Sequence, residues 1–205
     1  YYDITLLYEK TVNQVTSDIS SWKAFLKCTR HNYKLPFDDQ ILIYAQRPNA
    51  EAVLPIEVWN RAFNRMVNRG SRGIAVFDRA MPDGRQRLKY YFDISDTHAN
   101  ERLPKKQIPV WSMKEEYTQD VIETLENAFG ELKNKESLGD ALMSVAEIIT
   151  EDNLPDYLDD LQNNTEGSFL DDLDEDSLRV AYRQSVTVSV AYMLMERLGV
   201  RTEEY

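Results

Sequence analysis

The chain has 205 residues, of which 42% are hydrophobic and 29% charged, and its formal net charge is -11. It is long enough for one large domain or two small ones with a true apolar core, and its composition is that of a soluble globular protein. No apolar run reaches the roughly 18 to 20 residues that span a bilayer, and no signal sequence begins the chain, so we expect a cytoplasmic protein. The single cysteine, Cys28, excludes an internal disulfide and a cysteine framework for a structural metal site.

Hydrophobic periodicity and turn residues predict an α+β fold in the first half of the chain. In chain order the predicted elements are helices at 4–16, at 19–30 and from Phe37 to a stop at Pro48, a strand at 51–54, a helix at 55–68, and strands at 73–77 and 86–94. Pro55 is well placed to begin the fourth helix, and Pro82-Asp83-Gly84 marks a hairpin turn between the last two strands. We therefore expect a domain over residues 1–110 in which helices pack against a small antiparallel sheet of about three strands.

The second half of the chain is predicted to be helical. One apolar stripe runs from Tyr117 to Phe129, and a stronger one follows Ser137, which suits a helix N-cap. The segment 177–198 contains valines that alternate as in a strand, but its long flanking pattern and the stop at Gly199 favour a buried helix. We expect residues 111–205 to form an acidic helical extension that packs on the first domain or links it to a following module.

The net charge differs strongly between segments of the chain. The net charge is -2 for residues 1–20, +7 for residues 21–110 and -16 for residues 111–205. Electric fields act locally, so a basic surface can exist on a protein that is acidic overall. The low overall pI, about 4.7, therefore does not exclude binding to nucleic acid.

A run of cations that ends in aromatic residues is the strongest functional signal. It comprises Arg61, Arg65, Arg69, Arg72, Arg79, Arg85, Arg87 and Lys89, followed by Tyr90, Tyr91 and Phe92. Single-stranded nucleic acid is bound by cations that hold phosphates and by flat rings on which bases stack. A solvated basic face is the ordinary alternative for such a run.

Periodicity assigns these residues to faces of the predicted elements. On the helix at 55–68, Arg61 and Arg65 share the polar face, whereas Trp59 lies on the apolar face and is predicted to be a core residue. Alternation in the strand at 86–94 predicts a packed face with Leu88, Tyr90, Phe92 and Ile94 and an exposed face with Arg87, Lys89, Tyr91 and Asp93. On the third helix Gln40, Tyr44 and Arg47 share a polar face.

Cations from three elements, two of them with a tyrosine, predict one groove for a single strand. The candidate binding residues are Lys34, Gln40, Tyr44, Arg47, Arg61, Arg65, Arg69, Arg72, Arg87, Lys89 and Tyr91. Tyr44 and Tyr91 would stack bases, and Gln40 would donate hydrogen bonds. The phosphates would be held by Arg47, Arg61, Arg65, Arg69, Arg72, Arg87 and Lys89.

Other chemistries find little support in the sequence. Cys28 and His31 are three residues apart but do not complete a zinc site. The acidic patch that begins at Asp172 does not fit a calcium loop, because Ser177 and Arg183 occupy the positions that need glycine and glutamate. The motifs of metalloproteases, phosphate-binding loops and serine hydrolases are absent. We expect neither catalysis nor a cofactor.

Several short motifs follow one another in a recognisable order. They are Asp39-Gln40-Ile41-Leu42-Ile43-Tyr44-Ala45-Gln46-Arg47-Pro48, Ala50 to Val53, Trp59, Asn68-Arg69-Gly70, Arg72-Gly73-Ile74 and Phe92-Asp93-Ile94-Ser95-Asp96-Thr97. This order resembles the N-terminal single-stranded-DNA-binding domain of ArdC-type antirestriction proteins, over roughly residues 20 to 97. The resemblance implies an α+β domain that binds single-stranded DNA with little sequence preference, and it places the centre of the site at the turn 69–73.

The resemblance also implies a setting. Such domains occur on proteins of plasmids and conjugative elements, and similar ones begin very large proteins of integrative elements that carry helicase or methyltransferase modules downstream. Because the chain starts with Tyr1 and not with methionine, we expect it to be a segment of such a polypeptide. The metalloprotease domain that follows in some ArdC proteins is not present in this chain.

The chain departs from the family pattern at three places. Asp39 stands where asparagine is usual and is therefore expected to cap structure and not to contact DNA. Ser71-Arg72 replaces glutamate-lysine, which preserves the cation, and Asp96 replaces glutamine.

Two alternatives concern the acidic half. It could imitate DNA and occupy a restriction enzyme or another DNA-binding partner, with the basic half as a scaffold. It could instead only cap the first domain and link it to the next module, which we favour because acidic surface helices are common and need no partner.

Overall fold

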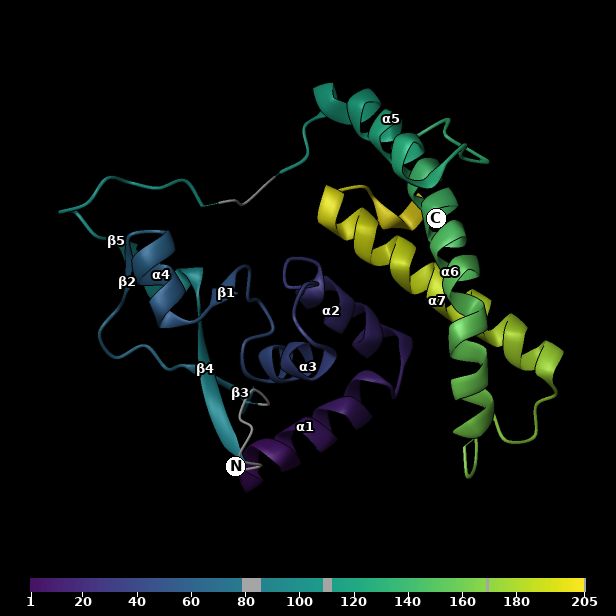
Figure 1. Ribbon diagram of the computed structural model, residues 1–205, viewed down its shortest axis with the longest axis horizontal. Helices are drawn as coiled ribbons and strands as arrows, with labels where there is room; N and C mark the ends of the chain where they lie inside the picture. Colours follow the sequence, from purple (N-terminus) through teal and green to yellow (C-terminus); the bar gives the residue numbers. More distant parts are fainter. Residues whose placement is uncertain (79–85, 109–111, 169, 205) are drawn as a thin grey trace. The chain divides into compact units, whose positions relative to one another are not determined.

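The computed structural model describes residues 1–78, 86–108, 112–168 and 170–204. The chain forms two compact units, residues 1–111 and 112–205, and each is described by itself (Figure 1). Unit 1 contains helices and two small antiparallel sheets, whereas the described part of unit 2 is helical. The predicted α+β class is therefore confirmed, as is the helical second half.

Three helices begin unit 1 close to their predicted positions. They are α1 (Tyr2–Val15), α2 (Ile19–Thr29) and α3 (Phe37–Gln46). The Asp18 side chain caps α2 by accepting a hydrogen bond from the Ser21 backbone N–H at 2.9 Å, which satisfies one of the free donors of the first turn. Pro36 precedes the first turn of α3, and Pro48 follows its end as predicted.

The main sheet of unit 1 has three antiparallel strands in the order β1-β4-β3. Its strands are β1 (Val53–Leu54), β3 (Ile74–Asp78) and β4 (Arg87–Asp93). The outer edge of β3 is paired by the side chain of Gln46, which exchanges hydrogen bonds of 2.8 and 3.0 Å with the backbone C=O and N–H of Ala75. In Figure 1, α1, α2 and α3 are grouped beside this sheet. The Pro82-Asp83-Gly84 turn lies outside the described residues.

The predicted helix at 55–68 is wrong in its second half. The helix α4 (Ile56–Ala62) is only seven residues long, and Asn64 takes the left-handed conformation at φ 52°. Beyond this break β2 (Arg65–Val67) pairs antiparallel with β5 (Thr97–Ala99), in a second, two-stranded sheet. Arg61 and Arg65 therefore do not share a helix face. Trp59, however, is fully buried as predicted, and its indole Nε1 donates to the Phe92 carbonyl at 2.8 Å.

Around Tyr90 and Tyr91 the faces of β4 are opposite to those predicted, although Arg87 is exposed and Leu88 packs against the core as predicted. Tyr91 is 7% exposed and Tyr90 is 52% exposed. The buried ring of Tyr91 belongs to a core cluster together with Cys28, Leu42, Ile43, Ala50, Val53, Ile74, Val76 and Phe77. The helices thus cover the face that holds Tyr91. Alternation alone could not decide between the faces, because it does not say which side of the sheet the helices cover.

The described part of unit 2 contains three α-helices, α5 (Thr118–Phe129), α6 (Leu138–Asn163) and α7 (Glu175–Leu198). It also contains the short 3-10 helices η2 (Glu115–Tyr117) and η3 (Thr202–Glu204). Ser137 caps α6 as predicted, in a reciprocal capping box with Asp140, and Gly199 ends α7 at φ 69°. On α5 the buried residue is Ile122, and the ends of the predicted stripe, Tyr117 and Phe129, are exposed.

Packing between α6 and α7 makes most of the core of unit 2. One cluster joins Leu142 and Ala146 of α6 to Ala191 and Met195 of α7. A second cluster toward the other end of the pair is formed by Leu154, Leu158 and Leu178. Among the described residues, no helix is both long enough and apolar enough to cross a membrane.

Candidate nucleic-acid interface

The turn between β2 and β3, residues 68–73, is anchored to the short 3-10 helix η1 (Ile94–Asp96). The Asn68 N–H donates to the Asp96 carbonyl at 2.8 Å, and the Ser71 N–H donates to the Asn68 carbonyl at 3.1 Å. Gly70 has φ 88°, a left-handed conformation that glycine adopts without the strain a side chain would cause. The turn therefore has a defined shape although it lies on the surface.

Two arginines project from this turn. Arg69 and Arg72 are both exposed, and neither guanidinium group has an ion-pair partner among the described residues. Two exposed cations on a fixed backbone, without an ion-pair partner in the described part of the chain, are suited to bind an anion.

Asp93 fixes the position of η1 and hence of the turn. Its carboxylate accepts the N–H groups of Glu51 and Ala52 at 2.9 and 3.0 Å, and the N–H and hydroxyl of Ser95 at 3.0 and 2.5 Å. Burial alone would raise the pKa of Asp93, but these hydrogen bonds, led by that of the Ser95 hydroxyl, prevail and lower it. Asp93 thus holds β1, β4 and η1 together as a buried carboxylate.

Arg47 joins the same region from the end of α3. Its guanidinium forms an ion pair with Asp96, with an N–O distance of 3.0 Å. It also borders a pocket of about 410 Å³, which Arg72 and Gly73 line from the turn and Asp3 lines from α1. The structure therefore brings Arg47 and Arg72 to one hollow, although they are distant in the sequence.

Tyr90 is a site residue that the sequence reasoning missed. A Cβ atom at Gly73 would lie 3.2 Å from Tyr90 Cβ and 3.3 Å from Tyr90 Cδ1, so Tyr90 lies against the residue that follows Arg72. Half of its surface is exposed. An exposed ring beside cations is the arrangement that stacks an unpaired base. The exposure of Tyr90 follows from the pairing of β3 with β4, in which the buried Tyr91 lies opposite the buried Ile74.

Tyr91 and Lys89 have a structural role. The Tyr91 hydroxyl donates to Asp39 at 3.2 Å, and Lys89 Nζ lies 3.0 Å from the same carboxylate and 5.3 Å from the centre of the Tyr91 ring. Burial raises the pKa of Tyr91. Burial lowers the pKa of Lys89, but the hydrogen bonds to Asp39 and Tyr91 and the charges of these two groups together outweigh burial, so the net shift of this pKa is upward. The expectation that Tyr91 is exposed is wrong, and Asp39, 4% exposed, is part of the fold.

Two further candidates, Gln40 and Arg65, already use their polar groups inside the protein. The Gln40 amide donates to the Leu35 carbonyl at 2.6 Å. The Arg65 guanidinium donates to the Thr97 hydroxyl and carbonyl at 2.7 and 2.8 Å. These groups hold α3 and the β2-β5 sheet in place, and DNA would have to replace those bonds.

The remaining candidates do not gather at the turn. Lys34 is exposed beside Tyr33, and Arg61 is exposed at the end of α4. No hydrogen bond or ion pair of the described residues joins Lys34 or Arg61 to the turn. Arg87 is exposed on β4, and Tyr44 is partly buried and lines a different pocket. Arg79 and Arg85 lie outside the described residues.

The side chains at the turn are of kinds that can bind nucleic acid. Arg47, Arg69 and Arg72 can hold phosphates, and Tyr90 can stack a base. Within the part of the chain that the structure describes, no group of three or more His, Cys, Asp and Glu side chains could hold a metal ion. Comparison of the chain with protein-family models, with curated proteins and with solved structures gives no match. Function must therefore be inferred from these residues.

Proposed function

We propose that unit 1 binds single-stranded DNA with little sequence preference and catalyses no reaction. The observation that carries this proposal is the pair of exposed arginines, Arg69 and Arg72, on an anchored turn next to the half-exposed ring of Tyr90. The resemblance to ArdC-type domains, whose motif includes this turn, supports the same conclusion.

In the proposed complex, phosphates contact Arg69 and Arg72, and a third phosphate contacts Arg47, near the pocket that Arg72 also lines, where it replaces the Asp96 carboxylate as the ion-pair partner. One base stacks on Tyr90. Because every base has a flat face and phosphates carry no sequence information, such contacts bind many sequences with similar strength. A paired base cannot offer its face to Tyr90 without leaving the duplex stack, so the site favours single strands.

A salt titration with matched variants tests this proposal. A labelled single-stranded oligonucleotide is bound at several salt concentrations, and three neutralised phosphates predict a slope of log affinity against log salt of about -2. The variant Arg69→Gln/Arg72→Gln should bind at least tenfold more weakly, with a shallower slope. The control Lys10→Gln/Lys114→Gln removes the same charge from exposed positions on α1 and ahead of η2. Equal effects of the two variants, or an affinity independent of salt, would refute the proposal.

The biological setting follows from the resemblance and is part of the proposal. The chain would be a cytoplasmic module of an antirestriction or conjugation-related protein of a mobile element. Helicase or methyltransferase modules downstream in the same polypeptide would be its partners. Unit 2 would link the DNA-binding unit to them.

A second candidate function concerns unit 2 alone. The end of its α6-α7 pair is crowded with exposed carboxylates, at Asp152, Asp156, Asp159, Asp160, Glu166, Asp171, Asp172, Asp174, Glu175 and Asp176. Such a surface could imitate the phosphates of DNA and occupy a DNA-binding enzyme. Neutralising Asp156, Asp159 and Asp160 would then abolish the inhibition of that enzyme, whereas Arg69→Gln/Arg72→Gln would not.

A further inference from the structure

The two-stranded sheet of β2 and β5 has an exposed face, and β2 leads directly into the turn at 68–73 (Figure 1). Met66 of β2 and His98 of β5 lie opposite each other in the register of this sheet, and both are exposed. Because side chains alternate along a strand, Asn68 lies on the same side as Met66. Its amide oxygen is 2.6 Å from His98 Nδ1. His98 is therefore in direct contact with the first residue of the turn.

The contact with Asn68 determines where the ring of His98 carries its proton. An amide oxygen can only accept a hydrogen bond, so His98 Nδ1–H donates to it and Nε2 is the basic nitrogen. Neither ring nitrogen has a further hydrogen-bond or ion-pair partner among the described residues. Protonation of Nε2 therefore adds a donor and a positive charge to an exposed ring, and the bond to Asn68 is kept.

The charged groups on the elements that adjoin His98 are mostly cations. They are Arg65 on β2, Arg69 and Arg72 on the turn, Asp96 on η1, and Glu101 and Arg102 in the chain after β5. The Arg65 guanidinium is bonded to Thr97, and the Asp96 carboxylate is paired with Arg47. Within the described residues, no ion pair joins His98 to any of these groups. A phosphate beside the ring would favour its protonated form, and a protonated ring would in turn bind the phosphate more tightly.

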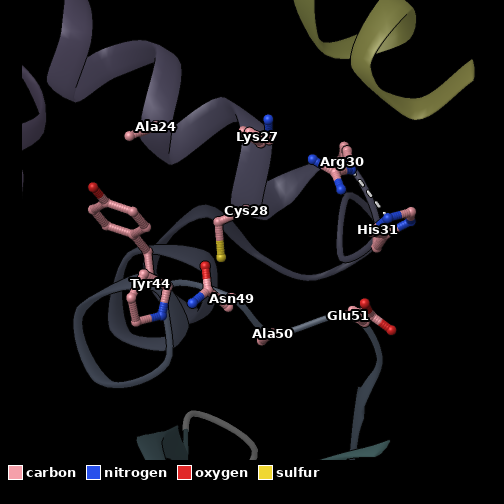
Figure 2. A pocket seen from close by; sticks show the side chains of 10 residues that line it. Ala24, Lys27, Cys28, Arg30, His31, Tyr44, Asn49, Ala50 and Glu51 are labelled. Carbon is pink, nitrogen blue, oxygen red and sulfur yellow. Dashed lines mark hydrogen bonds between the residues drawn. The ribbon is translucent and has the colours of Figure 1, made fainter. Parts of the chain in front are cut away.

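The second histidine of the chain lies elsewhere. His31 Nε2 accepts a hydrogen bond from Arg30 Nε at 3.0 Å, at a pocket of about 320 Å³ between α2 and the segment that follows α3 (Figure 2). Tyr44 and Asn49 line the same pocket, whereas none of residues 68–73 does. Of the two histidines, His98 is thus the one that adjoins the turn, and His31 provides a matched control.

We propose that His98 is a further phosphate contact for the bound single strand, an inference that rests on the function proposed above for the turn. The strand would run from Arg69 onto the exposed face of the β2-β5 sheet, where one phosphate accepts a hydrogen bond from the protonated Nε2 of His98. The exposed side chain of Met66, opposite His98, offers an apolar contact for the sugar or base of that nucleotide. Because the charge of a histidine side chain ordinarily changes between about pH 5 and 8, DNA affinity should rise as the pH falls through this range.

Binding of a labelled oligothymidine at pH 8.0 and pH 5.5, at constant ionic strength, tests the proposal. Thymine does not change its charge in this range, and the label is a dye whose emission does not depend on pH. The wild type should bind about five- to tenfold more tightly at pH 5.5, with a slope of log affinity against log salt that is steeper by about 0.7. His98→Gln should lose both changes and keep its affinity at pH 8.0 within about twofold of the wild type. His98→Arg, which is charged at both pH values, should bind at pH 8.0 about as tightly as the wild type does at pH 5.5.

The control variant His31→Gln removes the other histidine and should keep the pH dependence of the wild type. Circular dichroism at both pH values shows whether each variant is folded. Binding at pH 8.0 that is no tighter at pH 5.5, or equal tightening in folded His98→Gln, would overturn the role of His98 and leave the binding proposed for the turn intact. Absence of binding at both pH values would overturn both.

Discussion

Replacing Asp93 by asparagine should destabilise unit 1 strongly, although the two side chains have the same shape. Asp93 is 2% exposed. One of its carboxylate oxygens accepts two backbone N–H groups, from Glu51 and Ala52, and the other accepts the N–H and hydroxyl of Ser95. Asparagine keeps one acceptor oxygen and replaces the other with an NH2 group, which would face two donors.

The size of the effect follows from these contacts. Each hydrogen bond to a charged group contributes about 1.5 to 3 kcal/mol, and a buried donor without a partner adds its own cost. The Ser95 hydroxyl can rotate toward another acceptor, so about one full bond and part of a second are lost. We expect Asp93→Asn to lower the free energy of unfolding by roughly 2 to 4 kcal/mol at pH 7.

The same contacts predict a dependence on pH. The pKa of Asp93 is lower in the folded than in the unfolded protein, so the carboxylate stabilises the fold at all pH values above its ordinary pKa, near 3.9. This contribution is lost as the pH falls below that value and through the folded pKa. The stability difference between the wild type and Asp93→Asn should therefore be constant from pH 7 to about 5 and shrink toward pH 2.5.

Urea unfolding followed by tryptophan fluorescence measures this difference. Trp59 is fully buried in unit 1, so the change in its fluorescence reports on the unfolding of that unit. The control Asp3→Asn changes an exposed carboxylate in the first turn of α1 and should cost at most about 0.5 kcal/mol. A loss below about 1 kcal/mol for Asp93→Asn, or a difference that does not change between pH 7 and 2.5, would refute the role given to this carboxylate.

Four other substitutions and the alkylation of Cys28 should have measurable effects. Tyr90→Ala should weaken single-stranded DNA binding by about 1 to 3 kcal/mol, whereas Tyr91→Phe should leave affinity unchanged and lower thermal stability. Gly73→Ala should lower the free energy of urea unfolding by roughly 1 kcal/mol, because the added Cβ meets Tyr90 and Phe92 at 3.2 Å. Cys28, with a pKa of about 11, should react with iodoacetamide at pH 8 about a hundredfold more slowly than in urea. Ser137→Ala should cost unit 2 about 1 kcal/mol, measured by helical circular dichroism.

Local patterns predicted most of the helices because helices are held by local interactions. The apolar periodicity of α1 to α3, the stop at Pro48 and the cap at Ser137 all lie within a few residues of the feature they determine. The error at 55–68 arose where a distant partner decides the structure. Residues 65–67 form a strand because β5, thirty residues later, pairs with them after the break at Asn64.

The sequence predicted only those parts of the candidate site that depend on residues adjacent in the chain. The turn with Arg69 and Arg72 follows from glycines and cations that are adjacent in the sequence. The pairing of Arg47 with Asp96 joins residues 49 positions apart, and no local pattern contains it. The exposure of Tyr90 in place of Tyr91 depends on which side of the sheet the helices cover, which strand alternation leaves open.

The affinity of the chain for a single strand, compared with the duplex of the same sequence at one salt concentration, tests the central claim most directly. The site described here, with a stacking ring at Tyr90 and cations at Arg69 and Arg72, predicts at least tenfold tighter binding of the single strand. This preference should disappear in Tyr90→Ala. Equal or tighter binding of the duplex, or no binding of either, would contradict the account.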